Sequence, residues 1–312
     1  MKKALLEMLI CPLCLPEENS LSETILEVTR SDIVEGVLRC EKCGKGYPIH
    51  RGIAFLDPNR TTRVKPENRY ETPPILSSYL WSHFGDLIKD EFFSDAYSEW
   101  AGLMKGGSGA CLDIGSAVGR FSFEMAKKCD FVVGIDSSVS FIEASRDLMT
   151  HRMTRLELLQ EGVLTEEQVL HIPENWSTEN MEFIVGDALA LPFKSDFFPS
   201  VASLNVIDKV SKPMTHLTEI NRVAKKANAQ FLFSDPFSWS KEIAGEGDWL
   251  GGKNNGHFSG RGKDNIKALL QGKTGAMLPE WKIENNGHIW WKIRTHSNHF
   301  ELIRSCFLKA TR

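Results

Sequence analysis

Short apolar runs alternate with amphipathic segments along the chain after residue 110. Five runs are predicted as strands: residues 111–114, 131–135, 183–185, 201–206 and 230–233. Helical segments at residues 121–128 and 141–150 lie between the first three. Strands that alternate with helices pair in parallel, because each helix returns the chain to the same end of the sheet. The pattern predicts an α/β domain whose parallel sheet is covered by helices.

The pattern elsewhere indicates how the rest of the chain is organised. Residues 75–103 form an aromatic-rich helical segment, and residues 151–180 are polar and irregular, like an insertion. Two apolar stretches, around Trp281 and Leu302, predict an antiparallel hairpin at the edge of the sheet. Charged residues, Thr and Pro are frequent from Asn59 to Pro74, as is typical of a linker. We expect an N-terminal unit at 1–60, a linker at 61–74 and a larger domain at 75–312.

Charge and composition narrow the class of protein. The 312 residues include 37 basic and 41 acidic side chains, and this balance argues against a surface that binds nucleic acid throughout. No apolar run is long enough to span a bilayer. The first six residues resemble the start of a secretion signal, but Glu7 interrupts the apolar stretch and Cys11 follows at once. We therefore expect a cytoplasmic protein with no membrane contact.

Four of the seven cysteines fall in two C-x2-C pairs, Cys11 with Cys14 and Cys40 with Cys43. Such a pair can direct two thiolates to one tetrahedral ion, and a second pair completes a closed structural site. Unligated cysteines or a redox pair are the alternatives. Zinc is favoured because a segment this small has little core of its own, and an odd cysteine count does not suggest a disulfide framework.

The stretch from Gly46 to Ile53 follows the second pair. Together with the cysteines it resembles the small zinc-binding family that includes the activator subunit of tRNA and protein methyltransferases. The resemblance covers residues 5–57. It implies a folding or partner-binding module, because a zinc ion held by four cysteines has no open position for chemistry.

Carboxylates and small residues mark the ends of three successive predicted strands. The first strand leads into a turn with Gly115, Ala117 and Gly119, where a ligand can approach the backbone. Asp136 ends the second strand, where it could accept both ribose hydroxyls, and Asp187 ends the third, where it could accept from an adenine amino group. A nicotinamide-binding fold is the competitor, but its G-x-G-x-x-G loop is absent.

The three strand ends resemble the class I fold of S-adenosylmethionine (SAM)-dependent methyltransferases, a Rossmann-like sheet of seven strands. One departure is that Phe198 is followed by Pro199, where this fold often has Phe-Asp before its fourth strand. The resemblance implies SAM as cofactor. The residues expected to bind it are Asp113, Gly115, Ala117, Gly119, Asp136, Ser137, Asp187, Ala188 and Asn205.

Less generic strings between residues 70 and 309 resemble the C-terminal methyltransferase domain of the ovothiol-biosynthesis enzyme. They include Tyr70-Glu71-Thr72, His83-Phe84-Gly85, Asn205-Val206-Ile207-Asp208, Pro236-Phe237-Ser238-Trp239 and Ile293-Arg294-Thr295-His296. Ser116 and Asp235 depart from that family, and the zinc module is additional. The resemblance implies methyl transfer to an imidazole nitrogen, with a free histidine derivative or a protein histidine as acceptor.

The residues expected to act on the acceptor come from three parts of the chain. Asn205 and Asp208, with Asp235, lie near the carboxyl edge of the sheet and could take up the proton that the nucleophile loses. His83, with Tyr79, could close over the substrate, and Arg294 and His296 could hold a carboxylate or the ring. Structural alternatives exist for each of them. Asp208 could cap a helix, for example, and His83 could pack beside Trp81 and Phe84.

Two other functions compete with this interpretation. An RNA methyltransferase could bind nucleic acid through the zinc module, where the basic residues are Lys2, Lys3, Lys42, Lys45 and Arg51. A regulator without catalytic activity could bind SAM and recruit a partner protein through the same module. We expect a methyltransferase with a possible protein partner, and nucleic acid is the less favoured acceptor.

Overall fold

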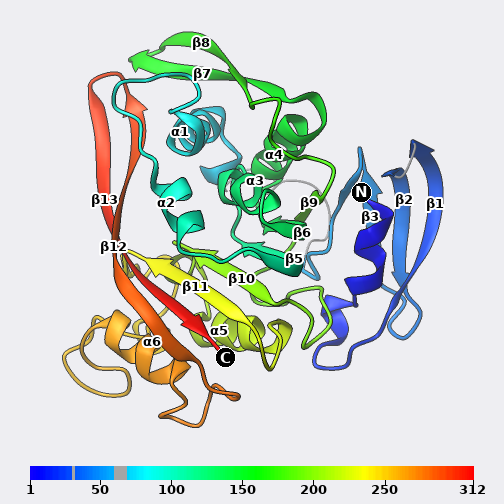
Figure 1. Ribbon diagram of the computed structural model, residues 1–312, viewed down its shortest axis with the longest axis vertical. Helices are drawn as coiled ribbons and strands as arrows, with labels where there is room; N and C mark the ends of the chain where they lie inside the picture. The colour runs from blue at the N-terminus through cyan, green and yellow to red at the C-terminus, as the bar shows by residue number, and fades with distance from the viewer. Residues whose placement is uncertain (30–31, 60–68) are drawn as a thin grey trace.

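The computed structural model describes residues 1–29, 32–59 and 69–312. A seven-stranded sheet runs through the larger part of the molecule in the order β12-β13-β11-β10-β5-β6-β9 (Figure 1). Its strands are β5 (Gly107–Ile114), β6 (Cys129–Asp136), β9 (Met181–Val185), β10 (Ser200–Leu204), β11 (Gln230–Asp235), β12 (Lys282–His296) and β13 (His299–Thr311). The first five are parallel, and β13 joins β11 antiparallel. The predicted α/β fold with a mostly parallel sheet of seven strands is confirmed.

Helices cover both faces of this sheet, and the alternation of side chains along the strands explains how. Cys111, Val132 and Phe183 pack toward α1 (Pro73–Phe84), α2 (Ala96–Gly102), α3 (Arg120–Ala126) and α4 (Val139–His151). Leu112 and Val133, one position along, pack toward α5 (Pro213–Val223) and α6 (Gly262–Leu270) on the opposite face (Figure 1). Successive side chains of a central strand point to opposite faces of the sheet, and both faces are buried. Most positions of such a strand are therefore apolar, which explains the short continuous apolar runs.

Two segments differ from what the sequence pattern predicted. The helical segment 75–103 is two helices, because the chain turns after Gly85 and is held there by Trp81 Nε1 donating to Asp90 Oδ2 at 2.8 Å. The interpretation of residues 151–180 as irregular was wrong. They contain the antiparallel pair β7 (Met153–Glu161) and β8 (Leu164–His171). Only Leu156, Leu158 and Leu170 of this pair are buried, so the apolar alternation is too sparse to read from sequence.

The predicted terminal hairpin exists, and it is longer than expected. β12 and β13 pair from Lys282–Thr311 to His296–His299 and extend past the sheet edge toward α1 and β7 (Figure 1). Ser82 Oγ in α1 donates to the Lys292 carbonyl at 2.6 Å, and Ser297 Oγ donates to the Gln160 carbonyl at 2.7 Å. The hairpin therefore connects the sheet to the elements that precede and follow α4.

The N-terminal module contains two short 3-10 helices, η1 (Lys3–Met8) and η2 (Pro12–Cys14), and a four-stranded antiparallel sheet. The strands are β1 (Leu21–Thr29), β2 (Asp32–Cys40), β3 (Gly46–His50) and β4 (Ile53–Ala54). The chain then bridges to the larger sheet, where Leu56 N donates to the Val185 carbonyl at 2.7 Å. Leu5, Leu9 and Leu38 share one continuous core with Phe193 of the larger domain.

The predicted linker, residues 61–74, falls largely on residues 60–68, which lie outside the described residues. Residues 69–71 form a 3-10 helix, and α1 begins at Pro73, where the missing proline N–H costs the helix nothing. Among the described helices, none is long and apolar enough to cross a membrane.

Candidate functional site

A cavity of about 680 Å³ opens at the carboxyl ends of β5, β6, β9 and β10. In open α/β sheets ligands bind at this edge, since the strands end there and the loops diverge. Every residue predicted to bind the cofactor lines this cavity except Gly119. The inner face of the β12–β13 hairpin forms a further wall, with Trp291, Ile293 and Ile303.

The loop after β5 folds tightly against the neighbouring strand. Gly115 N and Ser116 N both donate to the Ile135 carbonyl, at 2.8 and 3.1 Å. Gly115 has φ 72°, and a Cβ there would come within 2.4 Å of Val206 Cγ2, so only glycine fits. Gly119 has φ 87°, and its α-carbon faces the Phe183 ring, where a Cβ would come within 2.6 Å. Gly119 therefore serves helix packing, and the structure does not place it on the cavity as predicted.

Asp136 fixes this loop as well as lining the cavity. Its Oδ2 accepts from Ala117 N and its Oδ1 from Ser138 N, both at 2.9 Å. Burial raises the pKa of this carboxyl, and the two backbone N–H groups oppose the rise. Each carboxylate oxygen keeps a second lone pair, so Asp136 can still accept from two ribose hydroxyls.

Two further polar groups of the first strand and its loop line the same cavity. Asp113 accepts from Ser122 Oγ at 2.7 Å, and burial raises its pKa to about 7. Ser116 Oγ is buried with no hydrogen-bond partner among the described residues. A buried hydroxyl without a partner is costly unless a ligand supplies one. An acid and a free hydroxyl fit the amino and carboxyl groups of the methionine part of SAM.

Asp187 and Ala188 follow β9 at the other end of the cavity. Asp187 Oδ1 accepts from Leu189 N at 2.8 Å, which fixes the turn. The Ala188 carbonyl lies 3.2 Å from His216 Nδ1 in α5, and His216 Nε2 lies 2.8 Å from Ser203 Oγ in β10. Burial lowers the pKa of His216 to about 4, so this side chain is neutral at pH 7 and links two strand ends. Nothing in the local sequence distinguished His216.

Residues before α1 cover the cavity near the start of α4. Glu71 accepts from Val139 N and Ser140 N, both at 3.0 Å, and so caps that helix. Tyr70 lines the cavity, with its ring 6.1 Å from the Tyr79 ring and 5.9 Å from the Phe141 ring. Tyr70 was not predicted as a site residue, although its string was quoted for the family resemblance.

Asn205 lines the cavity directly after β10. Its φ of 61° is left-handed, a conformation that asparagine tolerates better than most residues, and its N–H donates to the Ser234 carbonyl at 2.7 Å. Beyond the predicted cofactor residues, the lining includes charged and aromatic side chains that the sequence did not single out. They are Tyr97, Lys209, Glu242, Trp291 and Glu301.

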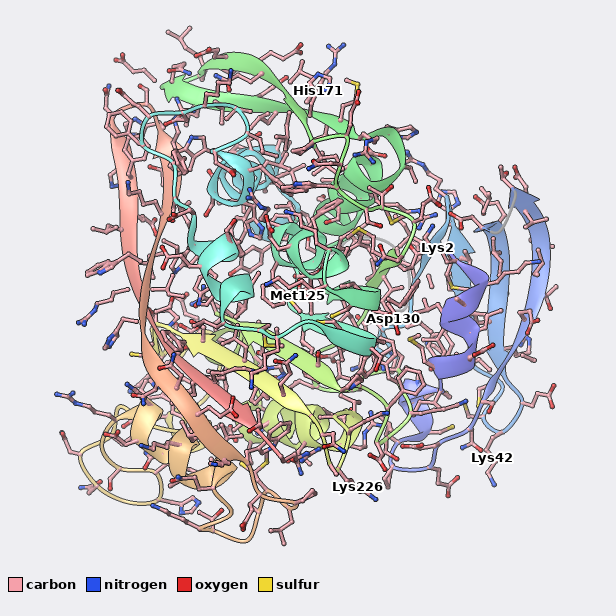
Figure 2. All side chains as sticks on the ribbon, in the orientation of Figure 1. Lys2, Lys42, Met125, Asp130, His171 and Lys226 are labelled. Atoms are coloured by element: carbon pink, nitrogen blue, oxygen red, sulfur yellow. The ribbon has the colours of Figure 1, made fainter. Side chains whose placement is uncertain are left out.

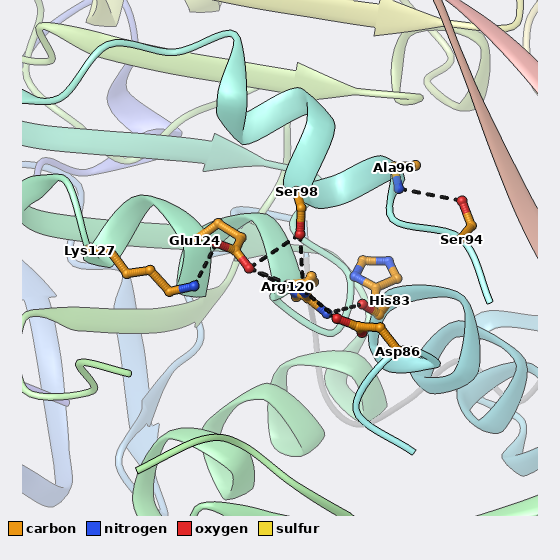
Figure 3. A network of polar contacts seen from close by, with 8 residues as sticks. All are labelled: His83, Asp86, Ser94, Ala96, Ser98, Arg120, Glu124 and Lys127. Atoms are coloured by element: carbon orange, nitrogen blue, oxygen red, sulfur yellow. Dashed lines mark hydrogen bonds and ion pairs between the residues drawn. The ribbon is translucent and has the colours of Figure 1, made fainter. Parts of the chain in front are cut away.

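His83 lies behind the cavity and does not line it, contrary to expectation. It is buried in α1, its ring is stacked on Tyr97 at 3.7 Å, and neither ring nitrogen has a partner among the described residues. Burial lowers its pKa well below the usual value. Its carbonyl accepts from Arg120 Nη1 at 3.0 Å (Figure 3). His83 is therefore a neutral packing residue in this structure.

Arg120 is the centre of the polar network beside His83. Its guanidinium donates to both carboxylate oxygens of Asp86, at 2.6 and 2.9 Å, and to Glu124 and Ser98 (Figure 3). These partners come from the segment after α1, from α3 and from α2. Arg120 thus joins the helices on one face of the sheet, immediately after the glycine loop.

Asp208 and Asp235 are buried beneath the cavity wall and do not line it. Asp208 Oδ2 accepts from Ser238 N at 2.8 Å and pairs with Lys209 Nζ at 3.1 Å. Asp235 Oδ1 accepts from Phe237 N at 2.7 Å, and burial together with Asp208 raises its pKa well above the usual value. These acids fix the loops from which Lys209 and Ser238 line the cavity.

Arg294 and His296 also lie outside the cavity lining, near the tip of the hairpin. Arg294 Nη2 donates to Gln160 Oε1 at 3.4 Å, and the His296 ring is 5.6 Å from the His299 ring. They were expected to hold a carboxylate or the ring of the acceptor, which would require them to lie over the strand ends. The hairpin is too long for that, because it continues past the sheet edge to β7.

The four predicted zinc ligands meet at one point of the N-terminal module. All four sulfur atoms lie within 4.8 Å of one another, and the Cys11–Cys43 and Cys14–Cys40 pairs are each 3.7 Å apart. Four thiolates about 2.3 Å from a tetrahedral zinc ion would lie about 3.8 Å apart, so the set fits structural zinc. Tyr47 Oη lies 3.2 Å from Cys11 Sγ and orients this ligand.

Two family models match separate parts of the chain. Residues 112–229 match a family model described as a methyltransferase domain, and residues 2–52 match a model of Trm112p-like proteins. No curated protein matches the chain.

Three solved structures are similar to the chain. A chain from the complex between the Haloferax volcanii Trm112 methyltransferase activator and a methyltransferase is 13% identical, with a TM-score of 0.47, over 80% of this chain and 99% of that one. A SAM-dependent methyltransferase of Aquifex aeolicus is 12% identical, with a TM-score of 0.42, over 77% and 97%. The YcgJ protein of Bacillus subtilis is 12% identical, with a TM-score of 0.44, over 69% and 99%. The chain therefore contains a SAM-dependent methyltransferase domain and an N-terminal Trm112p-like module, and the four cysteines of that module fit structural zinc.

Proposed function

We propose that the chain transfers a methyl group from SAM to a ring nitrogen of an imidazole, in a histidine derivative or a protein histidine. The observation that supports this best is the composition of the cavity beyond the cofactor residues. Aromatic rings of Tyr79, Tyr97 and Trp291 line it, together with Ile293 and Ile303. Flat aromatic walls suit a flat ring, because stacked and edge-to-face contacts favour such pairs.

The chemistry needs little from the protein besides alignment. SAM supplies a methyl group on a positively charged sulfur, and the lone pair of a neutral ring nitrogen forms the new N–C bond while the S–C electrons remain on sulfur. The cavity walls hold the ring in line with that bond. The ring becomes a cation and passes the proton of its other nitrogen to a carboxylate of the cavity, Glu242 or Glu301, or to solvent water. Glu242 and Glu301 line the same cavity, and their charge stabilises this cation.

The basic residues of the zinc module support an RNA acceptor poorly. Lys2 Nζ lies 3.8 Å from Asp32, and Arg51 lies 3.6 Å from Glu143 of α4, so both charges are engaged within the chain. Lys2 faces the larger domain, whereas Lys42 lies at the opposite end of the module (Figure 2). These positions form no continuous basic stripe of the kind that tracks a phosphate backbone.

A purely regulatory role also has less support than catalysis. The zinc module packs against this chain's own sheet and shares its core. The cavity continues past the residues that suit SAM to a second set of polar and aromatic side chains, as an enzyme with a second substrate requires. A protein that only held SAM would have no need for that second set.

The test is a labelled methyl-transfer assay with SAM and four acceptors in parallel: histidine, thiohistidine, a histidine-containing peptide and RNA. We expect the label on a ring nitrogen, located by mass spectrometry of the product. Label on RNA or on a carboxylate would overturn the proposal, as would SAM binding with no transfer to any acceptor. Asn205→Ala should lower turnover and leave SAM affinity nearly unchanged, because the other residues expected to bind SAM remain and the Asn205 side chain is proposed to contact the acceptor.

A further inference from the structure

A chain of hydrogen bonds leads from the terminal hairpin to Asn205. Trp291 Nε1 in β12 donates to Ser305 Oγ in β13 at 3.0 Å, and Ser305 Oγ donates to Asn205 Oδ1 at 2.7 Å. The Ser305 hydroxyl is fully buried, whereas Trp291 and Asn205 both line the cavity. Sequence separations of 14 and 100 residues mean that only the folded hairpin brings the three together.

The donor and acceptor in each of these hydrogen bonds follow from the chemistry of the Trp291 indole. An indole N–H can only donate, so Ser305 Oγ must accept from Trp291. The hydroxyl proton of Ser305 then needs its own acceptor, since a buried donor left without one costs about 1–3 kcal/mol. Asn205 Oδ1 is that acceptor. If the Asn205 amide were turned over, its NH2 group would face the hydroxyl and the Ser305 proton would lose this partner.

We propose that Ser305 and Trp291 are positioning residues that orient the Asn205 amide, so that its Nδ2 hydrogens are directed to the methyl acceptor. Asn205 then donates a hydrogen bond to an oxygen of the acceptor molecule, away from the ring nitrogen that takes the methyl group, and it does not receive the proton released in the reaction. This inference rests on the proposed function in one respect, that Asn205 faces the acceptor. It makes the hairpin β12–β13 a part of the catalytic machinery as well as a sheet edge.

Alternation along the hairpin explains why these two residues can reach Asn205. In the register that pairs Trp291 with Ile303 and Ile289 with Ser305, these four side chains lie on the inner face. Trp290 and Arg304, one position away on each strand, are exposed on the outer face. A shift of one residue would turn Ser305 to solvent and leave Asn205 without its partner.

A double-mutant cycle on the full-length protein tests the coupling, with kcat and KM measured for whichever acceptor takes the label. We expect Asn205→Ala to lower kcat/KM by about 100-fold and Ser305→Ala by about 10-fold, and the double variant to be no worse than Asn205→Ala alone. A fully additive loss of about 1000-fold would overturn the proposal, because Ser305 would then act apart from Asn205. Ser305→Ala with normal turnover would overturn it as well.

Ser234→Ala is the matched control. Ser234 is a fully buried serine in the neighbouring strand β11, and its hydroxyl has no partner among the residues described. Losing that hydroxyl should leave turnover within about twofold of the parent. Ser305→Thr keeps the hydroxyl and should recover most of the activity that Ser305→Ala loses. A Ser234→Ala variant as slow as Ser305→Ala would mean that the loss is a general packing effect, and the proposal would fail.

Two further measurements separate this inference from the identity of the acceptor. Asn205→Asp keeps the shape of the side chain and removes its donor hydrogens, so it should be as slow as Asn205→Ala, and substantial activity would overturn the donor role. In protein labelled with 15N-tryptophan, the Trp291 indole signal, assigned through Trp291→Phe, should shift in Ser305→Ala and stay in Ser234→Ala. An unmoved signal in Ser305→Ala would refute the hydrogen-bond chain, whichever acceptor the enzyme uses.

Discussion

A buried network around the Arg146–Glu182 ion pair of the catalytic domain also contacts the zinc module, and removing one partner of the pair should have a large effect on stability. Glu182 in β9 has a fully buried side chain, and the Arg146 guanidinium of α4, 9% exposed, pairs with its Oε1. Arg146 also lies 3.4 Å from Asp32 of the module, and Glu182 Oε2 accepts from Lys2 N. The perturbation is Glu182→Ala, which leaves Arg146 with Asp32, whose side chain is 23% exposed, as its counter-charge among the described residues.

The size of the loss follows from burial. Removing one partner of a buried pair typically costs about 3–5 kcal/mol, because the remaining charge is left in a poorly solvated site. The Arg51–Glu143 pair joins the same two parts of the chain at 3.6 Å, but its side chains are 64% and 43% exposed. Glu143→Ala should therefore cost less than about 1 kcal/mol. The two variants differ mainly in burial, so Glu143→Ala is the matched control.

The assay is equilibrium unfolding in urea, followed by tryptophan fluorescence with zinc present throughout. Replacing both partners by methionine should recover most of the stability that Glu182→Ala loses, because a buried apolar pair carries no desolvation penalty. If Glu182→Ala does not fold, Glu182→Gln provides a milder step that keeps a hydrogen-bond acceptor. A loss below about 1 kcal/mol, equal to that of Glu143→Ala, would refute the reasoning that burial makes this pair decisive.

Three other predictions concern the metal and the cofactor. The purified protein should contain one zinc ion per chain, and elemental analysis without zinc would contradict this. Cys40→Ser should release the zinc ion. It should also weaken SAM binding, because Leu56 at the end of the module hydrogen-bonds Val185, two residues before Asp187. Asp136→Ala should weaken SAM binding by about 1.5–3 kcal/mol, measured by calorimetry, through lost hydrogen bonds to ribose and a looser glycine loop. Burial raises the pKa of Asp113 from its ordinary 3.8 to about 7, so the fold favours the neutral acid and loses stability as pH rises through that window. SAM is a cation and favours the ionised acid, so its affinity should increase between about pH 5.5 and 7.5. Asp113→Asn should flatten that increase, and an unchanged pH profile would exclude Asp113 from the site.

The cofactor half of the site and the zinc ligands could be predicted because both depend on short-range features. Asp113 lies near the end of β5, two residues before Gly115, and Cys11 and Cys14 are three residues apart, so spacing along the chain places their side chains close together. Asp136 and Asp187 are far apart in sequence, but parallel strands bring their carboxyl ends to the same edge. The alternation of strands and helices was therefore enough to bring these acids together.

The part of the cavity beyond the predicted cofactor residues was decided by tertiary structure. His83, Arg294 and His296 were chosen for their chemistry, yet α1 turns His83 toward Tyr97, and the hairpin carries the other two past the sheet edge. Trp291 and Ser305 reach Asn205 only through the pairing register of the hairpin. A register shift of one residue reverses every side chain, and the mixed sequence of these strands does not determine which face is buried. Local sequence thus determined the turns and strand ends that are predicted to hold the cofactor, whereas long-range strand pairing selected the side chains that line the rest of the cavity.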